Sequence, residues 1–138
     1  MARSRTEVTV GDTIGPVIVL VGRDTLVAYA GASLDQNPIH QDEEFATGVG
    51  LPDVIAHGMW TMGAASSVVA DWAGDAGRVE SFRTRFISMV VVPSAGAEIE
   101  VSGVVSKMDD EGRVTVDVTA TAEGTKVLGR CSGVVRLD

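Results

Sequence analysis

The spacing of apolar residues changes once along this chain, and that change is the strongest constraint on its fold. Within residues 56–73, apolar side chains recur every three or four positions, as at Met59, Met62 and Val69, which predicts one long helix. From Val79 onward the period becomes two, which predicts β-strands. The sequence therefore predicts an α+β fold with helices on one side of an antiparallel sheet.

Four strands are expected in the second half of the chain, over residues 79–90, 98–108, 113–122 and 126–137. The segments between them are rich in Gly, Pro, Asp and Ser, and they are short enough to join antiparallel neighbours. The middle of the long helix, from Gly63 to Ser67, contains only small residues. Such a helix can be approached closely, which favours a curved sheet wrapped around it.

The first half of the chain predicts shorter elements. Residues 16–21 form an almost continuous β-branched run, which is typical of a buried strand. Residues 23–31 are expected to form a helix that ends at Gly31 as its C-cap. A short helix over residues 42–47 should begin with Asp42 as its N-cap.

Length and charge restrict the classes of function. A chain of 138 residues is the size of one ordinary domain, so a single domain over residues 1–138 is expected. Nineteen acidic and eleven basic residues give a net charge of −8, which disfavours nucleic acid and anionic membranes as partners. No signal peptide or membrane-spanning apolar run is visible, so the cytoplasm is the expected location.

Asp35 and His40 are the first candidates for chemistry. They are five residues apart and share no helical face, but Pro38 forces the chain to turn between them and could bring both to one point. General acid–base catalysis needs a carboxylate and an imidazole that converge in this way. The alternative is purely structural, because Asp35 and Asn37 are also typical turn residues that bond to nearby backbone.

The His57-Gly58 pair begins the long helix and is the second candidate. The first N–H groups of a helix have no intrahelical acceptor, so that of Gly58 could donate to an oxygen that becomes negative during a reaction. Glycine would also let a substrate approach the backbone closely. The alternative is that Gly58 serves packing and His57 is an ordinary residue of the capping region.

Other chemistries have weaker support. His40, Asp42, Asp53 and His57 are residue types that bind metals, but their spacing matches no metal motif, so no metal is expected. Cys131 lies in a predicted strand among small residues, which indicates a buried, inert thiol.

The two candidate blocks together resemble a known family. The segments Tyr29-Ala-Gly-Ala-Ser-Leu-Asp-Gln-Asn-Pro-Ile-His-Gln-Asp and Ile55-Ala-His-Gly-Met-Trp-Thr-Met-Gly are similar to the hydratase motif of MaoC-like, (R)-specific enoyl thioester hydratases and dehydratases. Asp71-Trp-Ala-Gly-Asp, Arg85-Phe and Val92-Pro resemble most the B subunit of the mycobacterial-type fatty acid synthase II 3-hydroxyacyl-ACP dehydratase.

The resemblance implies a hot-dog fold, in which an antiparallel sheet wraps a central helix and domains work in pairs. It assigns the catalytic roles to Asp35 and His40 and the oxyanion-binding N–H to Gly58, with Ser33, Asn37 and His57 in support. Family members commonly have Ser-Gly-Asp where this chain has Leu34 in the middle position. If that position has a positive φ, Leu34 is strained there.

The resemblance also implies a hydro-lyase that needs no cofactor and acts on an acyl-CoA or acyl-carrier-protein thioester in fatty acid or related acyl-chain elongation. The partner would be a second copy or a sister hot-dog subunit. Cations that could meet an acidic carrier are Arg78, Arg83, Arg85, Lys107 and Arg130. The alternatives are an (R)-specific enoyl-CoA hydratase of β-oxidation type, a hot-dog thioesterase and a non-catalytic acyl-binding subunit.

Overall fold

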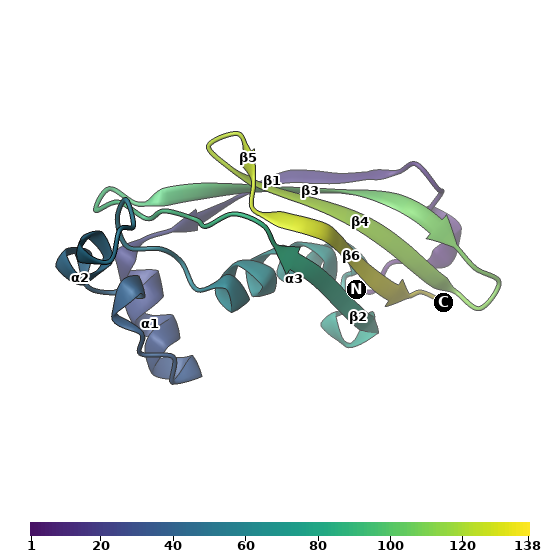
Figure 1. Cartoon of the computed structure of the whole chain (residues 1–138). Coiled ribbons are helices and arrows are strands. Elements are labelled where there is room, and N and C mark those ends of the chain that lie inside the picture. Colours follow the sequence, from purple (N-terminus) through teal and green to yellow (C-terminus); the bar gives the residue numbers. More distant parts are fainter.

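The computed structural model describes residues 1–138, and its main feature is one curved antiparallel sheet (Figure 1). Five of the six strands pair in the order β1-β3-β4-β6-β2, and β5 pairs with β4 alone. The strands are β1 (Thr13–Val21), β2 (Val79–Phe86), β3 (Ala97–Met108), β4 (Arg113–Ala122), β5 (Thr125–Lys126) and β6 (Leu128–Arg136). This is the hot-dog fold of the α+β class.

The helices lie on one side of this sheet (Figure 1). They are α1 (Arg23–Ser33), α2 (Glu43–Gly48) and α3 (Gly58–Ala73), with short 3-10 helices at Arg5–Glu7, Pro38–His40 and Ala76–Arg78. As predicted, Asp42 caps α2, because its Oδ1 accepts a hydrogen bond from the N–H of Phe45 at 3.0 Å. No helix is long and apolar enough to cross a membrane.

The core lies between the sheet and α3. The alternation predicted for residues 113–122 is confirmed, because the side chains at Val114, Val116, Val118 and Ala120 are all buried. The small residues of α3 lie on both sides of the helix, and only some of them pack against the sheet. Ala65 is buried, while Gly63 and Ser67 are exposed. One face of α3 is therefore covered by the sheet, and the opposite face is open.

The end of α1 differs from the prediction. The helix continues through Gly31 to Ser33, and Leu34 is its C-cap in the left-handed conformation, with φ 66° and ψ 11°. The N–H of Leu34 donates to the carbonyl of Ala30 at 3.0 Å, which is the bond that a glycine cap would make. The strain expected at Leu34 is therefore present.

The segment after β2 is a second difference. The strand ends at Phe86 rather than continuing to residue 90, because the chain then leaves β6 and crosses to another partner. The N–H of Ala56 donates to the carbonyl of Val90 at 2.9 Å, and Ile55 forms an isolated bridge with Val91. The apolar residues of this segment consequently line a wall beside the start of α3.

The last predicted strand is divided in two. Val127 lies between β5 and β6, where its N–H donates to the carbonyl of Ala120 and its own carbonyl accepts from Ile87. The interruption lets the chain receive the segment that leaves β2. Residues 126–137 thus supply parts of two strands, and the adjacent residues Val127 and Leu128 at the break are both buried.

Candidate active site

The loop between α1 and α2 is held by hydrogen bonds from its own polar side chains. Ser33 Oγ accepts from the N–H of Asp35 at 3.2 Å, and Asp35 Oδ1 accepts from the N–H of Asn37 at 3.2 Å. Asn37 Oδ1 in turn accepts from the N–H of Ile39 at 3.1 Å, which caps the 3-10 helix that carries His40. The turn chemistry that the sequence predicts is therefore present, and it fixes the path from Asp35 to His40.

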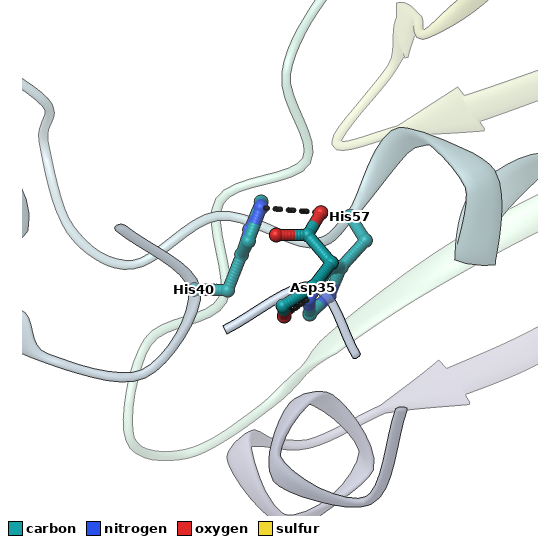
Figure 2. Close-up of side chains that lie close together, drawn as sticks. All are labelled: Asp35, His40 and His57. Carbon is teal, nitrogen blue, oxygen red and sulfur yellow. Dashed lines mark hydrogen bonds and ion pairs between the residues drawn. The ribbon is translucent and has the colours of Figure 1, made fainter. Parts of the chain in front are cut away.

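His40 is buried and its ring is oriented by the backbone. Its Nδ1 lies 2.6 Å from the carbonyl oxygen of Ile55. Because a carbonyl can only accept, Nδ1 carries the hydrogen, and in the neutral ring Nε2 carries the free lone pair. This nitrogen faces Asp35 Oδ2 at 3.9 Å (Figure 2).

The gap between His40 and Asp35 has a chemical consequence. A separation of 3.9 Å is too long for a direct hydrogen bond. One water oxygen about 2.8 Å from each atom would hydrogen-bond to both. The side chain of Asp35 is 53% exposed, so solvent and substrate can reach it. The predicted convergence of these two side chains is thus present in the structure.

His57 lies against the same pair. Its ring stacks on that of His40 with centroids 3.7 Å apart, and its Nε2 lies 3.1 Å from the carbonyl oxygen of Asp35. The ring of Tyr29 packs against the His57 ring in a T-shaped arrangement, with ring centroids 4.8 Å apart. His57 is the N-cap residue of α3, but its side chain makes no capping bond and instead bonds to the Asp35 loop.

Gly58 is the first residue of α3, as predicted. Its N–H donates to no carbonyl or side chain of the protein. A Cβ at this position would lie 3.2 Å from the ring of Phe86. Glycine therefore keeps the space between the helix end and this ring open.

Two hollows meet at Gly58. One, of about 430 Å³, is mainly apolar and is lined by His40, Ile55, Ala56, Gly58, Thr61, the segment 86–90, Val127 and Leu128. The other, of about 500 Å³, is lined by Tyr29, Ser33, Asp35, His57, Gly58, Met59 and Phe86. Gly58 therefore lines one hollow together with His40 and the other together with Asp35.

The three titratable side chains at the site do not form a good metal centre. Asp35, His40 and His57 offer ligand atoms within 4.8 Å of one another. The two imidazole rings, however, are stacked with only 23° between their planes. Ring lone pairs lie in those planes, so both cannot point at one ion.

The other sequence candidates are used elsewhere. Asp42 caps α2, and Asp53 Oδ1 pairs with Arg23 at 2.6 Å. Cys131 is buried, and burial raises the pKa of its thiol, which agrees with an inert residue. Among the candidate cations, Arg78 is not free, because Asp138 pairs with it at 2.7 Å and raises the pKa of its guanidinium.

Three contributors to the site were not among the predicted site residues. Phe86 lines both hollows, but the sequence marks it only through the Arg85-Phe pair of the family resemblance, which assigns it no role. The backbone carbonyl of Ile55 fixes the tautomer of His40, and a main-chain contact of this kind has no sequence signal. Tyr29 lies in the recognised motif, where its contact with His57 could have been suspected.

The fold and the site together define a hot-dog domain with a paired carboxylate and imidazole. The sequence matches the family described as MaoC like domain over residues 3–126, and the chain belongs to this family. A solved MaoC-like dehydratase is 41% identical with a TM-score of 0.96, and the match covers 99% of this chain and 43% of that one.

More distant relatives match this chain over part of their sequence or share its fold. Fatty acid synthase beta subunit TOXC of Cochliobolus carbonum is 35% identical over 117 residues, which are 80% of this chain but 5% of that protein. The (R)-hydratase PhaJ1 of Pseudomonas aeruginosa has a TM-score of 0.88 at 22% identity, covering 99% of this chain and 87% of that one. The HadBC (3R)-hydroxyacyl-ACP dehydratase complex of Mycobacterium tuberculosis has a TM-score of 0.70 at 21% identity, and the match covers 91% of this chain and 96% of that one.

These likenesses support different statements. The family match supports hydro-lyase chemistry of the hydratase and dehydratase type. The last two structures, at under 25% identity, show the shared fold. The narrower likeness to the B subunit of the mycobacterial-type dehydratase stays a prediction.

Proposed function

We propose that this chain catalyses the reversible syn addition of water to a trans-2-enoyl thioester, giving an (R)-3-hydroxyacyl thioester. The observation that carries the proposal is the 3.9 Å gap between His40 Nε2 and Asp35 Oδ2, open to solvent beside the unpartnered N–H of Gly58. Membership of a family of hydratases and dehydratases supports the same reaction class.

In the direction of hydration, His40 and Asp35 hold one water molecule. Nε2 of His40 has the lone pair and takes one proton from the water, while the Asp35 carboxylate accepts a hydrogen bond from the other hydrogen. The water oxygen bonds to C3, and the imidazolium then returns its proton to C2. The step balances, since one O–H bond and the C2=C3 π bond break while one C–O and one C–H bond form.

The thioester oxygen becomes negative as the water adds. In this proposal the N–H of Gly58, at the positive end of α3, donates a hydrogen bond to it. Because the thioester already acidifies C2, the reaction needs no metal or redox cofactor. In the reverse direction the same groups remove the C2 proton and expel the hydroxyl as water.

The apolar hollow of about 430 Å³ would receive the acyl chain. We further propose that a second hot-dog chain, identical or a sister subunit, completes the site, because the open face of α3 and the hollow that contains Asp35 are uncovered in the single chain. The thioester handle, coenzyme A or a carrier protein, belongs to the same proposal.

An assay with a short trans-2-enoyl-CoA tests the reaction. Loss of the enoyl absorbance without release of free thiol, with (R)-3-hydroxyacyl-CoA as product, is the expected result. Thiol release would instead identify a thioesterase. Binding of the thioester without turnover, alone and with candidate sister chains, would identify an acyl-binding subunit.

A further inference from the structure

His57 connects two parts of the site that come from distant segments of the chain. Its side chain reaches the carbonyl of Asp35, which lies 22 residues earlier, at 3.1 Å. Its backbone is joined directly to Gly58, and its own carbonyl accepts the N–H groups of Trp60 and Thr61 at 3.1 and 3.2 Å. One residue thus bridges the loop that carries Asp35 and the first turn of α3.

The hydrogen bond determines the tautomer of His57. A carbonyl only accepts, so Nε2 carries the hydrogen. Nδ1 then holds a lone pair, and it is buried without a partner in the protein. His57 is only 2% exposed, His40 stacks on one face of its ring, and Tyr29 contacts the ring in a T-shaped arrangement. Its position is therefore set by one hydrogen bond and by ring packing.

The two histidines have opposite tautomers in this arrangement. His40 carries its hydrogen on Nδ1 and His57 on Nε2. The ring stack places the two imidazoles 3.7 Å apart, so movement of His57 would displace His40 as well as Asp35. A displacement of about 1 Å at such a site can cost about a hundredfold in rate.

We infer that His57 is a positioning residue whose Nε2–H holds the Asp35 loop at a fixed distance from the N–H of Gly58. This inference rests on the proposed function. His57 itself exchanges no proton with the substrate. It keeps the groups that handle water in register with the group that binds the thioester oxygen.

The first test does not depend on activity. The chain contains two histidines, so nitrogen-15 spectra of labelled protein in mildly alkaline buffer, where imidazoles are neutral, give two resolvable rings. The expected pattern is one ring protonated on Nδ1 and one on Nε2, with the second assigned to His57 by its loss in His57→Gln. Two rings of the same tautomer, or the reverse assignment, would overturn the inference.

The second test separates the hydrogen bond from the ring. Gln places its amide N–H near the position of Nε2, whereas Phe keeps the ring but has no donor and Asn is too short to reach Asp35. His57→Gln is expected to keep kcat within about threefold, while His57→Phe and His57→Asn lower kcat by about 10- to 100-fold. KM should change by less than about threefold in all three, since none contacts the acyl chain directly.

Thr25→Ala is the matched stability control. It removes a bond of 3.1 Å between Thr25 Oγ1 and the N–H of Gly22, at the end of α1 far from Asp35. Its kcat should stay unchanged, although its loss of thermal stability should be similar to that of the His57 variants. A fully active His57→Phe with an inactive His57→Gln would show that only ring packing matters. If the unmodified protein shows no hydratase activity, the proposed function fails while the tautomer test still decides the hydrogen bond.

Discussion

The Asp35 loop and the first turn of α3 place their functional atoms by opposite means. In the loop, side chains do the chemistry and irregular backbone positions them, with Leu34 strained at φ 66° and each polar side chain bonded to a neighbouring N–H. At the helix, a regular backbone supplies a main-chain N–H, and a Cβ at Gly58 would meet only the ring of Phe86.

This difference predicts how each region responds to substitution. In the loop, a change of one functional atom should remove activity while the turn persists. At the helix end, most substitutions retain the N–H, so only a residue without an N–H tests its role. The four substitutions below test whether the loop acts through its side chains and the helix end through its main-chain N–H.

Asp35→Asn should have the largest effect. Asn keeps an Oδ1 that can accept the N–H of Asn37, so the loop should fold unchanged. It loses the negative charge that faces Nε2 of His40 and would stabilise the imidazolium formed there, so kcat should fall by about 10³-fold. Steady-state kinetics with an enoyl thioester and the melting temperature measure the two effects. A fall in activity that is matched by unfolding would contradict the account.

His40→Asn removes the catalytic nitrogen but keeps a donor. The Asn side-chain amide lies near the position of Nδ1 and can still donate to the carbonyl of Ile55. Because nothing replaces Nε2, kcat should fall by about 10²- to 10³-fold. Turnover of this variant near that of the unmodified protein would remove His40 from the mechanism.

Gly58→Pro tests the main-chain donor. Proline is tolerated at the first position of a helix, and His57 has φ −60° and ψ 133°, which a residue before proline readily adopts. Loss of the N–H should lower kcat/KM by about 10²-fold or more. Gly58→Ala is the control, because it retains the N–H and meets only the exposed ring of Phe86. Equal losses in the two variants would assign the effect to crowding.

Leu34→Gly should have the smallest effect on activity and a positive effect on stability. The left-handed conformation costs a side-chain residue about 1 kcal/mol, and the side chain of Leu34 is 81% exposed, so little packing is lost. The free energy of unfolding should rise by about this amount in chemical denaturation. Glu123→Gly, at φ 49° in a distant turn, should give a similar gain. A loss of stability in Leu34→Gly would show that its conformation is not strained.

Much of the regular structure could be predicted from local sequence. The strand over residues 113–122 has the predicted limits, and α3 begins at Gly58, within the predicted range of 56–73. These elements combine a clear period with turn residues at their ends. Periodicity did not predict that β2 ends at Phe86. The apolar sequence continues beyond this residue, but the chain stops pairing with β6 and instead pairs with the segment around Ile55.

The site was predictable only in part for a similar reason. The turn at Asn37 and Pro38 made the approach of Asp35 to His40 foreseeable, since local hydrogen bonds build that turn. The stack of His57 on His40 joins segments that meet only in the folded chain. Phe86 reaches Gly58 across the sheet and helix layers, a contact that local patterns do not encode.

The stereochemistry of hydration in deuterated water tests the central claim most directly. If a single water held by Asp35 and His40 supplies both the hydroxyl and the C2 proton from one face, the (R)-3-hydroxyacyl product carries one deuterium at C2, syn to the hydroxyl. Proton spectra of the isolated product measure this arrangement. Anti addition, or deuterium distributed over both C2 positions, would contradict a mechanism with both groups on one face of the substrate.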